Sequence, residues 1–70
     1  MRKWLYEARS KSGLTQKQMG EKLDITEAYY SYIESGERQK KLDITLAAKL
    51  SGIFGMTIQQ IVELESKKEE

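Results

Sequence analysis

The 70-residue chain contains no cysteine, no histidine and no proline. Without cysteine there is no disulfide and no thiolate chemistry, and without histidine the commonest general base and zinc ligand is missing. The carboxylates are scattered over expected helix surfaces, so they form no acid–base or metal constellation. The sequence therefore argues against an enzyme, and it indicates no metal, no other cofactor and no small-molecule ligand.

Long apolar runs are also missing. No stretch approaches the roughly 18 apolar residues of a membrane span, and the opening MRKWLYEAR lacks the apolar core of a signal peptide. We therefore expect a cytoplasmic protein that makes no membrane contact.

The length of the chain allows one small domain. A domain of 70 residues buries only about 60% of its unfolded surface, so its core is small. Helices packed on their sequence neighbours are the simplest way to build such a core, and no proline interrupts them. We expect one all-α domain over residues 1–66, followed by a charged tail over residues 67–70.

Capping signals divide the domain into five helices. Thr15 and Gln18 match the Thr-x-x-Gln capping box of a helix start, and Thr26, Asp43 and Thr57 are further N-cap residues. Glycines follow the first, third and fourth of the expected helices, where the left-handed conformation ends a helix without steric cost. The expected helices cover residues 2–12, 15–23, 26–35, 44–54 and 57–64.

Apolar residues recur at helical spacing in these segments. The expected core contains Leu5, Ala8, Leu14, Met19, Leu23, Ile25, Tyr30, Ile33, Ile44, Ala47, Leu50, Phe54, Ile58, Ile61 and Val62. On the first helix, Arg2 is expected outside, with Lys3, Glu7 and Lys11. Gly20 costs a helix interior about 1 kcal/mol relative to alanine, which suggests that another helix crosses closely there.

Leu64, and part of Trp4, have no obvious place in this core. Two interpretations are open. Either the fifth helix is a dimer interface, or the two residues simply complete a small core.

The outward face of the expected third helix is aromatic and hydroxylated as well as charged. It presents Glu27, Ala28, Tyr29, Ser31 and Tyr32. An α-helix fits the major groove of DNA, where a carboxylate can accept from cytosine, a methyl can touch thymine and a tyrosine can pair or pack. Tyrosines also serve in cores and interfaces. The spacing to Ile33 assigns Tyr30 to the core and leaves Tyr29 open.

The net charge of +1 is unevenly distributed. Residues 1–41 carry nine Lys/Arg against six Asp/Glu, and residues 42–70 carry three against five. The positive potential therefore lies on the half that contains the second and third helices. A polyanion-binding face and an ordinary solvated surface are both compatible with this distribution.

Five short motifs follow one another at fixed separations: GLTQ at 13–16, MG at 19–20, LDIT at 23–26, SYIESG at 31–36 and FGMTI at 54–58. Together they resemble the helix-turn-helix of the Cro and repressor type, the family also called xenobiotic response element regulators. The similarity covers roughly residues 5–62. It implies a compact five-helix, lambda-repressor-like domain that binds double-stranded DNA with its third helix in the major groove, usually as a homodimer on a palindromic operator.

The resemblance also implies residue roles. Base edges would be faced by Glu27, Ala28 and Tyr32, with Tyr29 as a further candidate. The DNA phosphates would be contacted by Thr15, Gln16, Lys17, Ser31, Arg38, Lys40 and Lys41. Gln16 would also brace the base-reading side chains. Arg9 and Glu34 correspond to an internal ion pair that joins the first helix to the end of the third.

Three departures from the family pattern concern the helix pair and the loop after it. Gly20 stands where alanine is usual, which should loosen the pair slightly. Asp24 replaces the usual turn glycine and must adopt the left-handed conformation. The loop after Gly36 is about two residues longer than usual and lacks its proline.

The leading hypothesis is a sequence-specific transcriptional regulator, a repressor of the phage or mobile-element kind. The alternative is an antitoxin-like or protein-interaction module on the same fold, which would use its tyrosines as contact anchors.

Overall fold

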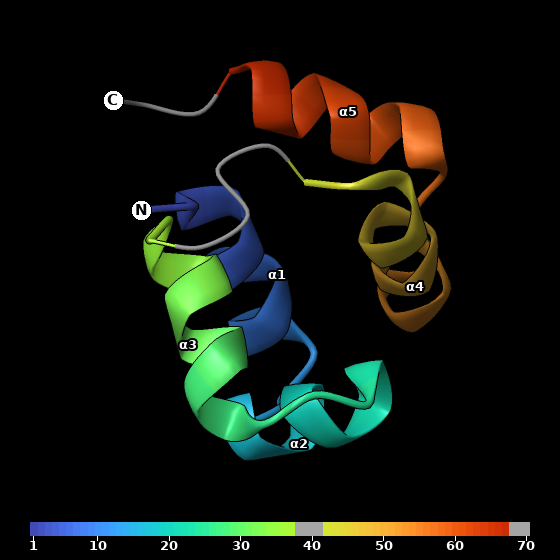
Figure 1. Ribbon diagram of the computed structural model, residues 1–70. Helices are drawn as coiled ribbons and strands as arrows, with labels where there is room; N and C mark the ends of the chain where they lie inside the picture. Colours follow the sequence, from blue (N-terminus) through green and yellow to red (C-terminus); the bar gives the residue numbers. More distant parts are fainter. Residues whose placement is uncertain (38–41, 68–70) are drawn as a thin grey trace.

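The computed structural model of the protein describes residues 1–37 and 42–67, and within these ranges it contains five α-helices and no strand. The helices are α1 (Lys3–Lys11), α2 (Gln16–Leu23), α3 (Glu27–Ser35), α4 (Ile44–Phe54) and α5 (Ile58–Ser66), as Figure 1 shows. The all-α, five-helix prediction is confirmed. The fifth helix continues to Ser66, two residues beyond its expected end.

The starts of α2 to α5 are set by their N-cap side chains. Each of these side chains accepts a hydrogen bond from the backbone amide three residues further on; the caps are Thr15, Thr26, Asp43 and Thr57. The capping box predicted for α2 is present, with Gln18 Oε1 accepting from the Thr15 amide at 2.9 Å. A second box, which the sequence analysis did not identify, joins Gln60 to the amide of Thr57 at 2.9 Å. The helices start where they do because these bonds satisfy otherwise free amides.

The turn between α2 and α3 depends on two unusual backbone positions. Asp24 has φ 62° and ψ 43°, the left-handed conformation that was expected of it. Gly20 lies against the turn, because the Ile25 amide donates to the Gly20 carbonyl at 2.9 Å. A Cβ on Gly20 would come 2.9 Å from the Ile25 carbonyl oxygen and 3.2 Å from the Glu27 nitrogen. The expected close approach at Gly20 is present, and it is made by the turn and the start of α3.

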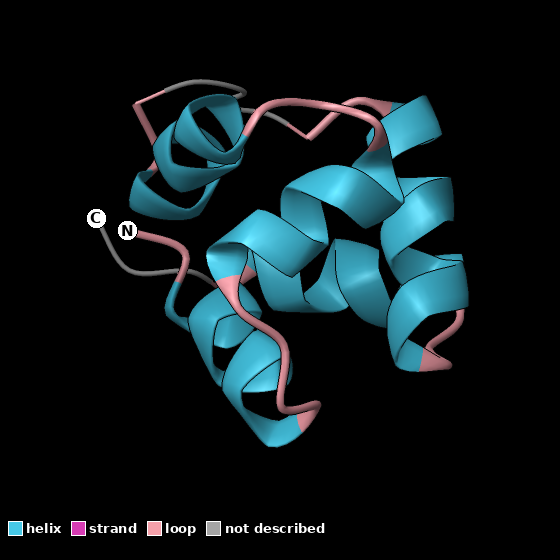
Figure 2. Ribbon diagram, turned by 90° about the horizontal axis from the view of Figure 1, so that it is seen from below, coloured by secondary structure: helices cyan, strands magenta, loops and turns pink. Residues whose placement is uncertain are grey.

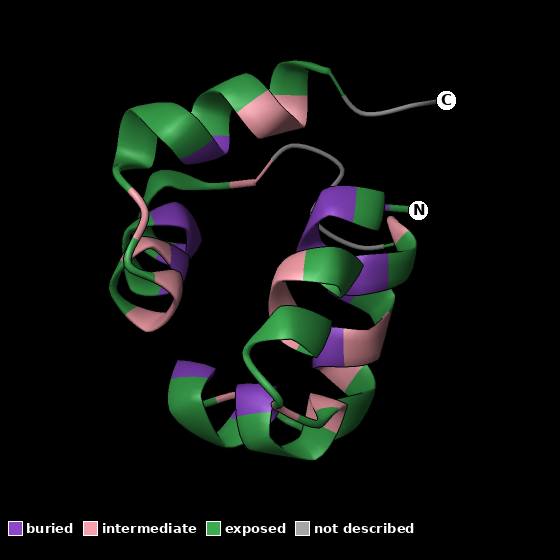
Figure 3. Ribbon diagram, turned by 180° about the vertical axis from the view of Figure 1, so that it is seen from behind, coloured by how far each residue is buried: buried purple, intermediate pink, exposed green. Residues whose placement is uncertain are grey.

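The core lies between the helices, as the buried positions in Figure 3 show. Among the described residues, ten hydrophobic side chains are buried, including Leu46, which was not in the predicted set: Trp4, Leu5, Met19, Leu23, Tyr30, Ile33, Leu46, Ala47, Leu50 and Ile61. Leu14, Ile25 and Phe54 are half-buried and pack against this core. The short turns between α2 and α3 and between α4 and α5 (loops in Figure 2) keep these two helix pairs in contact, while α1 packs on α3 and α2 on α4.

Three residues predicted for the core are exposed: Ile44 by 70%, Val62 by 56% and Ile58 by 38%. The prediction was wrong because helical spacing assigns a face without showing how wide the covered strip is. α5 lies at one edge of the fold and presents Ile61 and Leu64 inward, which leaves Ile58 and Val62 outside. Ile44 is the first residue of α4, two residues before Leu46, the first buried residue of that helix.

The expectations for the start of α1 and the end of α5 also need correction. Trp4 is buried and Leu64 is half-buried against the core, which supports the interpretation that both complete a small core. Arg2, expected outside, is fully buried. Charged residues at a helix start normally face water, and only a partner from elsewhere in the fold makes such burial acceptable.

Candidate DNA-binding surface

The outer face of α3 carries part of the residue set expected to read bases. Glu27 and Ala28 are exposed in its first turn, and Tyr32, one turn later, is 42% exposed. Tyr30 lies on the opposite side and is fully buried, as its spacing to Ile33 predicted. α3 therefore has one face for the core and one for solvent.

Tyr29 lies on the flank of α3 that faces α4. Its side chain is half-buried and packs against the core. It also lines a shallow groove with residues of the turn and of α4, namely Leu23, Ile25, Asp43, Thr45, Leu46 and Lys49. Its ring therefore contributes packing, whatever its hydroxyl contacts.

The residues expected at phosphates are spread around the start of α2. Thr15 is exposed but its hydroxyl caps the helix, and Lys17 is exposed beside it. Gln16 and Ser31 come together in a second groove, lined by Met1, Gln16, Ser31, Glu34 and Ser35. Three further candidates, Arg38, Lys40 and Lys41, lie outside the described residues.

The carboxylate of Glu34 gathers side chains from three helices. Arg9 of α1 donates from Nε to Glu34 Oε2 at 2.9 Å and from Nη2 to Oε1 at 3.3 Å. Tyr30 donates its hydroxyl to Oε2 at 2.8 Å, and Gln16 Nε2 donates to Oε1 at 3.0 Å. Arg9 also donates to the Leu14 carbonyl at 3.0 Å, just before the α2 cap. The network thus fixes α1, the start of α2 and α3 relative to one another.

The network also sets the ionisation of its members. Burial alone would raise the pKa of Glu34, but hydrogen bonds from Arg9, Tyr30 and Gln16 outweigh it, and the pKa is lowered. The bond to Glu34 raises the pKa of Arg9. Burial, followed by the bond to Glu34, raises the pKa of the Tyr30 hydroxyl. A carboxylate, a guanidinium and a neutral phenol are therefore the stable forms near neutral pH.

A second arginine, Arg2, which was expected outside and is fully buried, contacts the end of α3. Arg2 Nη1 donates to the Ile33 carbonyl at 2.6 Å, and the Arg2 amide donates to the Glu34 carbonyl at 2.8 Å. Arg2 Nε is hydrogen-bonded and ion-paired to Glu65 of α5. The indole of Trp4 donates to the same carboxylate at 3.2 Å. The sequence gives no signal for this pairing, because Arg2 and Glu65 stand at opposite ends of the chain.

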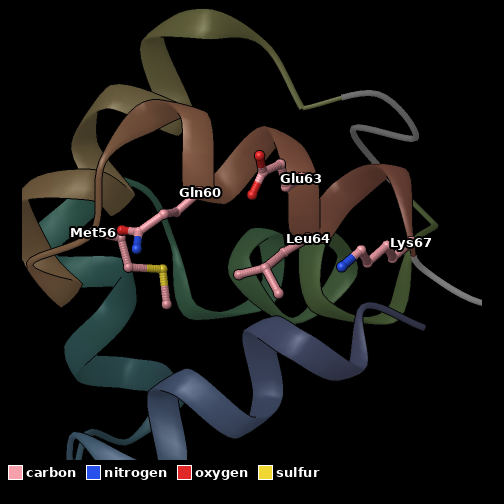
Figure 4. A pocket seen from close by; sticks show the side chains of 5 residues that line it. All are labelled: Met56, Gln60, Glu63, Leu64 and Lys67. Carbon is pink, nitrogen blue, oxygen red and sulfur yellow. The ribbon is translucent and has the colours of Figure 1, made fainter.

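Residues 1–37 and 42–67 contain no group of three or more His, Cys, Asp or Glu able to hold a metal ion. No helix within these ranges is long and apolar enough to cross a membrane. An open groove beside α1 is lined by Met56, Gln60, Glu63, Leu64 and Lys67, and Figure 4 shows Leu64 directed toward α1. Its lining has no arrangement of catalytic groups.

Comparison with known proteins gives a family. A family model described as helix-turn-helix matches residues 5–61, which is most of the chain and close to the span of the resemblance found in the sequence. Neither the curated proteins nor the solved structures gave a match. The matched span contains the capped helix pair and the network on Glu34. The chain belongs to the helix-turn-helix family of the Cro and repressor type and is a DNA-binding regulator.

Proposed function

We propose that this regulator recognises a specific operator by placing α3 in the major groove, and that it acts in the cytoplasm as a repressor of the phage or mobile-element type. The observation that carries the proposal is the two-sided character of α3. Its inner side is fixed by the bonds of Glu34 to Arg9, Tyr30 and Gln16. A helix held in this way presents its outer side chains in a constant geometry, which base readout requires.

The proposed reading residues are Glu27, Ala28 and Tyr32, with Tyr29 as a further candidate. A glutamate accepts a hydrogen bond from the cytosine amino group, and an alanine methyl packs on the thymine methyl. Glu27 also stands in the first turn of α3, where the helix dipole favours a negative charge. The proposed reading chemistry is therefore acidic and aromatic, and its preferred sequence should contain cytosine opposite Glu27.

The proposed backbone contacts come from the start of α2 and from the loop after α3. Gln16 donates one amide hydrogen to Glu34, and its amide nitrogen carries a second hydrogen for a phosphate oxygen. Lys17 and the loop cations Arg38, Lys40 and Lys41 would gain binding energy by releasing counterions. Thr15 and Ser31 lie within the same proposed contact region.

The proposed dimer uses α5. Ile58 and Val62 stand four residues apart on one face of this helix and are 38% and 56% exposed. Two apolar side chains at this spacing form a stripe that a second copy of the chain can cover. This pair replaces Trp4 and Leu64, which the fold uses for its own core. A two-fold dimer implies a palindromic operator.

The alternative function is a protein-interaction or antitoxin-like role on the same fold. It is favoured by two tyrosines that are well exposed, Tyr6 by 45% and Tyr32 by 42%. Exposed aromatic side chains are frequent anchors of protein interfaces. Under this alternative, α3 would contact a protein partner, and Glu27 would not need a base.

Selection from a random duplex library, followed by titration at two salt concentrations, distinguishes the two functions. A regulator should enrich a palindromic sequence and bind it more weakly as salt rises. The proposed set of four cations per protomer gives a slope of log K on log salt no steeper than about −7 for a dimer. No binding at low salt would overturn the proposed function.

Lys17→Gln supplies a residue-level test, with Lys22→Gln as its matched control. Both lysines are exposed on α2, and only Lys17 belongs to the proposed phosphate set. Loss of one phosphate contact should reduce the salt slope by about 1 per protomer. Equal effects of the two substitutions would show that Lys17 acts only through net charge.

A further inference from the structure

The C-terminal end of α3 is stabilised from outside its own sequence. The last turn of α3 contains no basic residue, although a cation there is favoured by the exposed carbonyls and the helix dipole. Arg2 supplies it. Its guanidinium binds the Ile33 carbonyl at 2.6 Å, and its backbone amide binds the Glu34 carbonyl at 2.8 Å.

Arg2 is held in this position by α5. Its side chain is fully buried, and Glu65 Oε2 accepts from Arg2 Nε. The same oxygen accepts from the indole of Trp4, so the carboxylate is fixed as well. A buried guanidinium requires a counterion, and moving Glu65 away would remove this ion pair beside the carbonyls of α3.

We propose that Arg2 is a positioning residue, and that Arg2 and Glu65 form a latch through which the placement of α5 controls the C-terminal end of α3. The proposal rests on the proposed function for its meaning in DNA binding, where α5 is the dimer helix and α3 the reading helix. The exposed pair Ile58 and Val62 lies on the same helix as Glu65. A partner bound to that pair would therefore restrain the position of Glu65. Because Glu65 holds Arg2 and Arg2 binds the end of α3, the partner would also restrain the end of the reading helix.

The latch is expected to matter because α5 is otherwise supported mainly by α4. Ile61 and Leu64 pack into the core, but the polar tie to the end of α3 passes through Arg2. Arg2 is a physically continuous link of the kind that carries coupling between elements, and the proposal adds an open arrangement to the latched one seen here.

The first test uses Glu65→Gln and measures amide hydrogen exchange residue by residue without DNA. Glutamine keeps the shape and an acceptor oxygen but removes the charge. The reporters are the amides of Gly36 and Glu37, which close the end of α3 on the Tyr32 carbonyl. The matched control is Glu63→Gln, which makes the same change on an exposed residue of the same helix.

We expect Glu65→Gln to accelerate amide exchange at Gly36 and Glu37 by roughly 2- to 30-fold more than it accelerates exchange in α2. Glu63→Gln should leave the exchange rate at Gly36 and Glu37, relative to that in α2, unchanged. A uniform change across all helices, or none at the end of α3, would show that the pair is only a structural contact and would overturn the proposal. Arg2→Lys keeps the charge without the planar fork, so it should behave like Glu65→Gln. Full protection in Arg2→Lys would also count against the latch.

The second test uses the duplex enriched from the random library, as a full palindrome and as a single half-site. Glu65→Gln should weaken half-site binding and also reduce cooperativity, the ratio of full-site affinity to the square of half-site affinity. Unchanged cooperativity in a variant that still dimerises would overturn the proposal. If the wild-type chain binds no duplex, the proposed function fails, and the exchange data alone decide the latch.

Discussion

The exchange Gly20→Ala sets helix propensity against packing. Alanine is about 1 kcal/mol better than glycine inside a helix. Its Cβ, however, would lie 2.9 Å from the Ile25 carbonyl oxygen and 3.2 Å from both the Thr26 carbonyl carbon and the Glu27 nitrogen. All three neighbours are backbone atoms, and the hydrogen bond from Ile25 N to the Gly20 carbonyl resists their displacement. We expect packing to win and the variant to be less stable than the wild type.

The size of the effect can be isolated with Gly52→Ala as the control. Gly52 is also helical, and a Cβ added to it meets no atom within 4 Å. This control should therefore stabilise the domain by about 0.5–1 kcal/mol. Since the gain in helix propensity is common to both variants, the difference between their free energies of unfolding measures the steric cost of the Cβ at position 20, which we expect to be about 1–3 kcal/mol. Gly20→Ala alone should then lose about 1 kcal/mol, or roughly 4–8 °C in Tm.

Urea unfolding followed by circular dichroism at pH 7 measures both variants on the same scale. DNA binding adds a second reading, because a Cβ at position 20 pushes on the first residues of α3 and should move Glu27 and Ala28. Gly52→Ala should leave DNA affinity unchanged. If Gly20→Ala proved as stable as Gly52→Ala, the reasoning from close backbone approach would be refuted.

Three further substitutions test the network and the proposed contacts. The hydrogen bonds from Arg9, Tyr30 and Gln16 hold the pKa of Glu34 below the ordinary value of a glutamate, so its stabilising contribution is complete above that ordinary value and is lost as the pH falls through the folded-state pKa. Glu34→Gln should lower the free energy of unfolding in urea by up to about 3 kcal/mol at pH 7, and the difference from the wild type should become smaller in acid. A difference that does not change with pH would contradict the assignment of Glu34 as an ionised carboxylate. Tyr32→Ala should relax preference at one operator position by about 1–3 kcal/mol, whereas equal losses on all sequences would exclude base reading. Gln16→Ala should weaken specific and non-specific binding alike, and a changed sequence preference would contradict its phosphate role.

Much of the fold could be predicted because its signals are local. Each N-cap side chain accepts a hydrogen bond from an amide only three residues further on, so both partners can be recognised in a short stretch of sequence. The caps are Thr15, Thr26, Asp43 and Thr57. The spacing of Tyr30 likewise assigned it correctly to the core. Ile58 and Val62 were misassigned because their burial depends on how many neighbours cover α5, which is a property of the assembled fold.

For the candidate site, the sequence could predict which side chains of α3 face solvent, because this follows from the helical spacing of its buried residues. Glu27 and Ala28 could be expected on the exposed side because Tyr30 and Ile33 define the buried side of α3. The roles of individual residues at bases and phosphates came from the family pattern. Arg2 could not be predicted, since an arginine beside a helix start is normally solvated. Its burial depends on Glu65, and the two are brought together only when α1, α3 and α5 have packed.

Two arginines on or beside α1 contact the C-terminal part of α3 through different atoms. Arg9 binds the side chain of Glu34, and Arg2 binds the main-chain carbonyl of Ile33. Both arginines make contacts within the domain, and neither belongs to the proposed set of phosphate contacts, although both count toward the net charge of the chain. In return, the orientation of α3 does not depend on Glu27 or Ala28, which are exposed in its first turn. Substitutions at these two positions should therefore change operator preference at little cost in stability, and a new specificity can arise without rebuilding the domain.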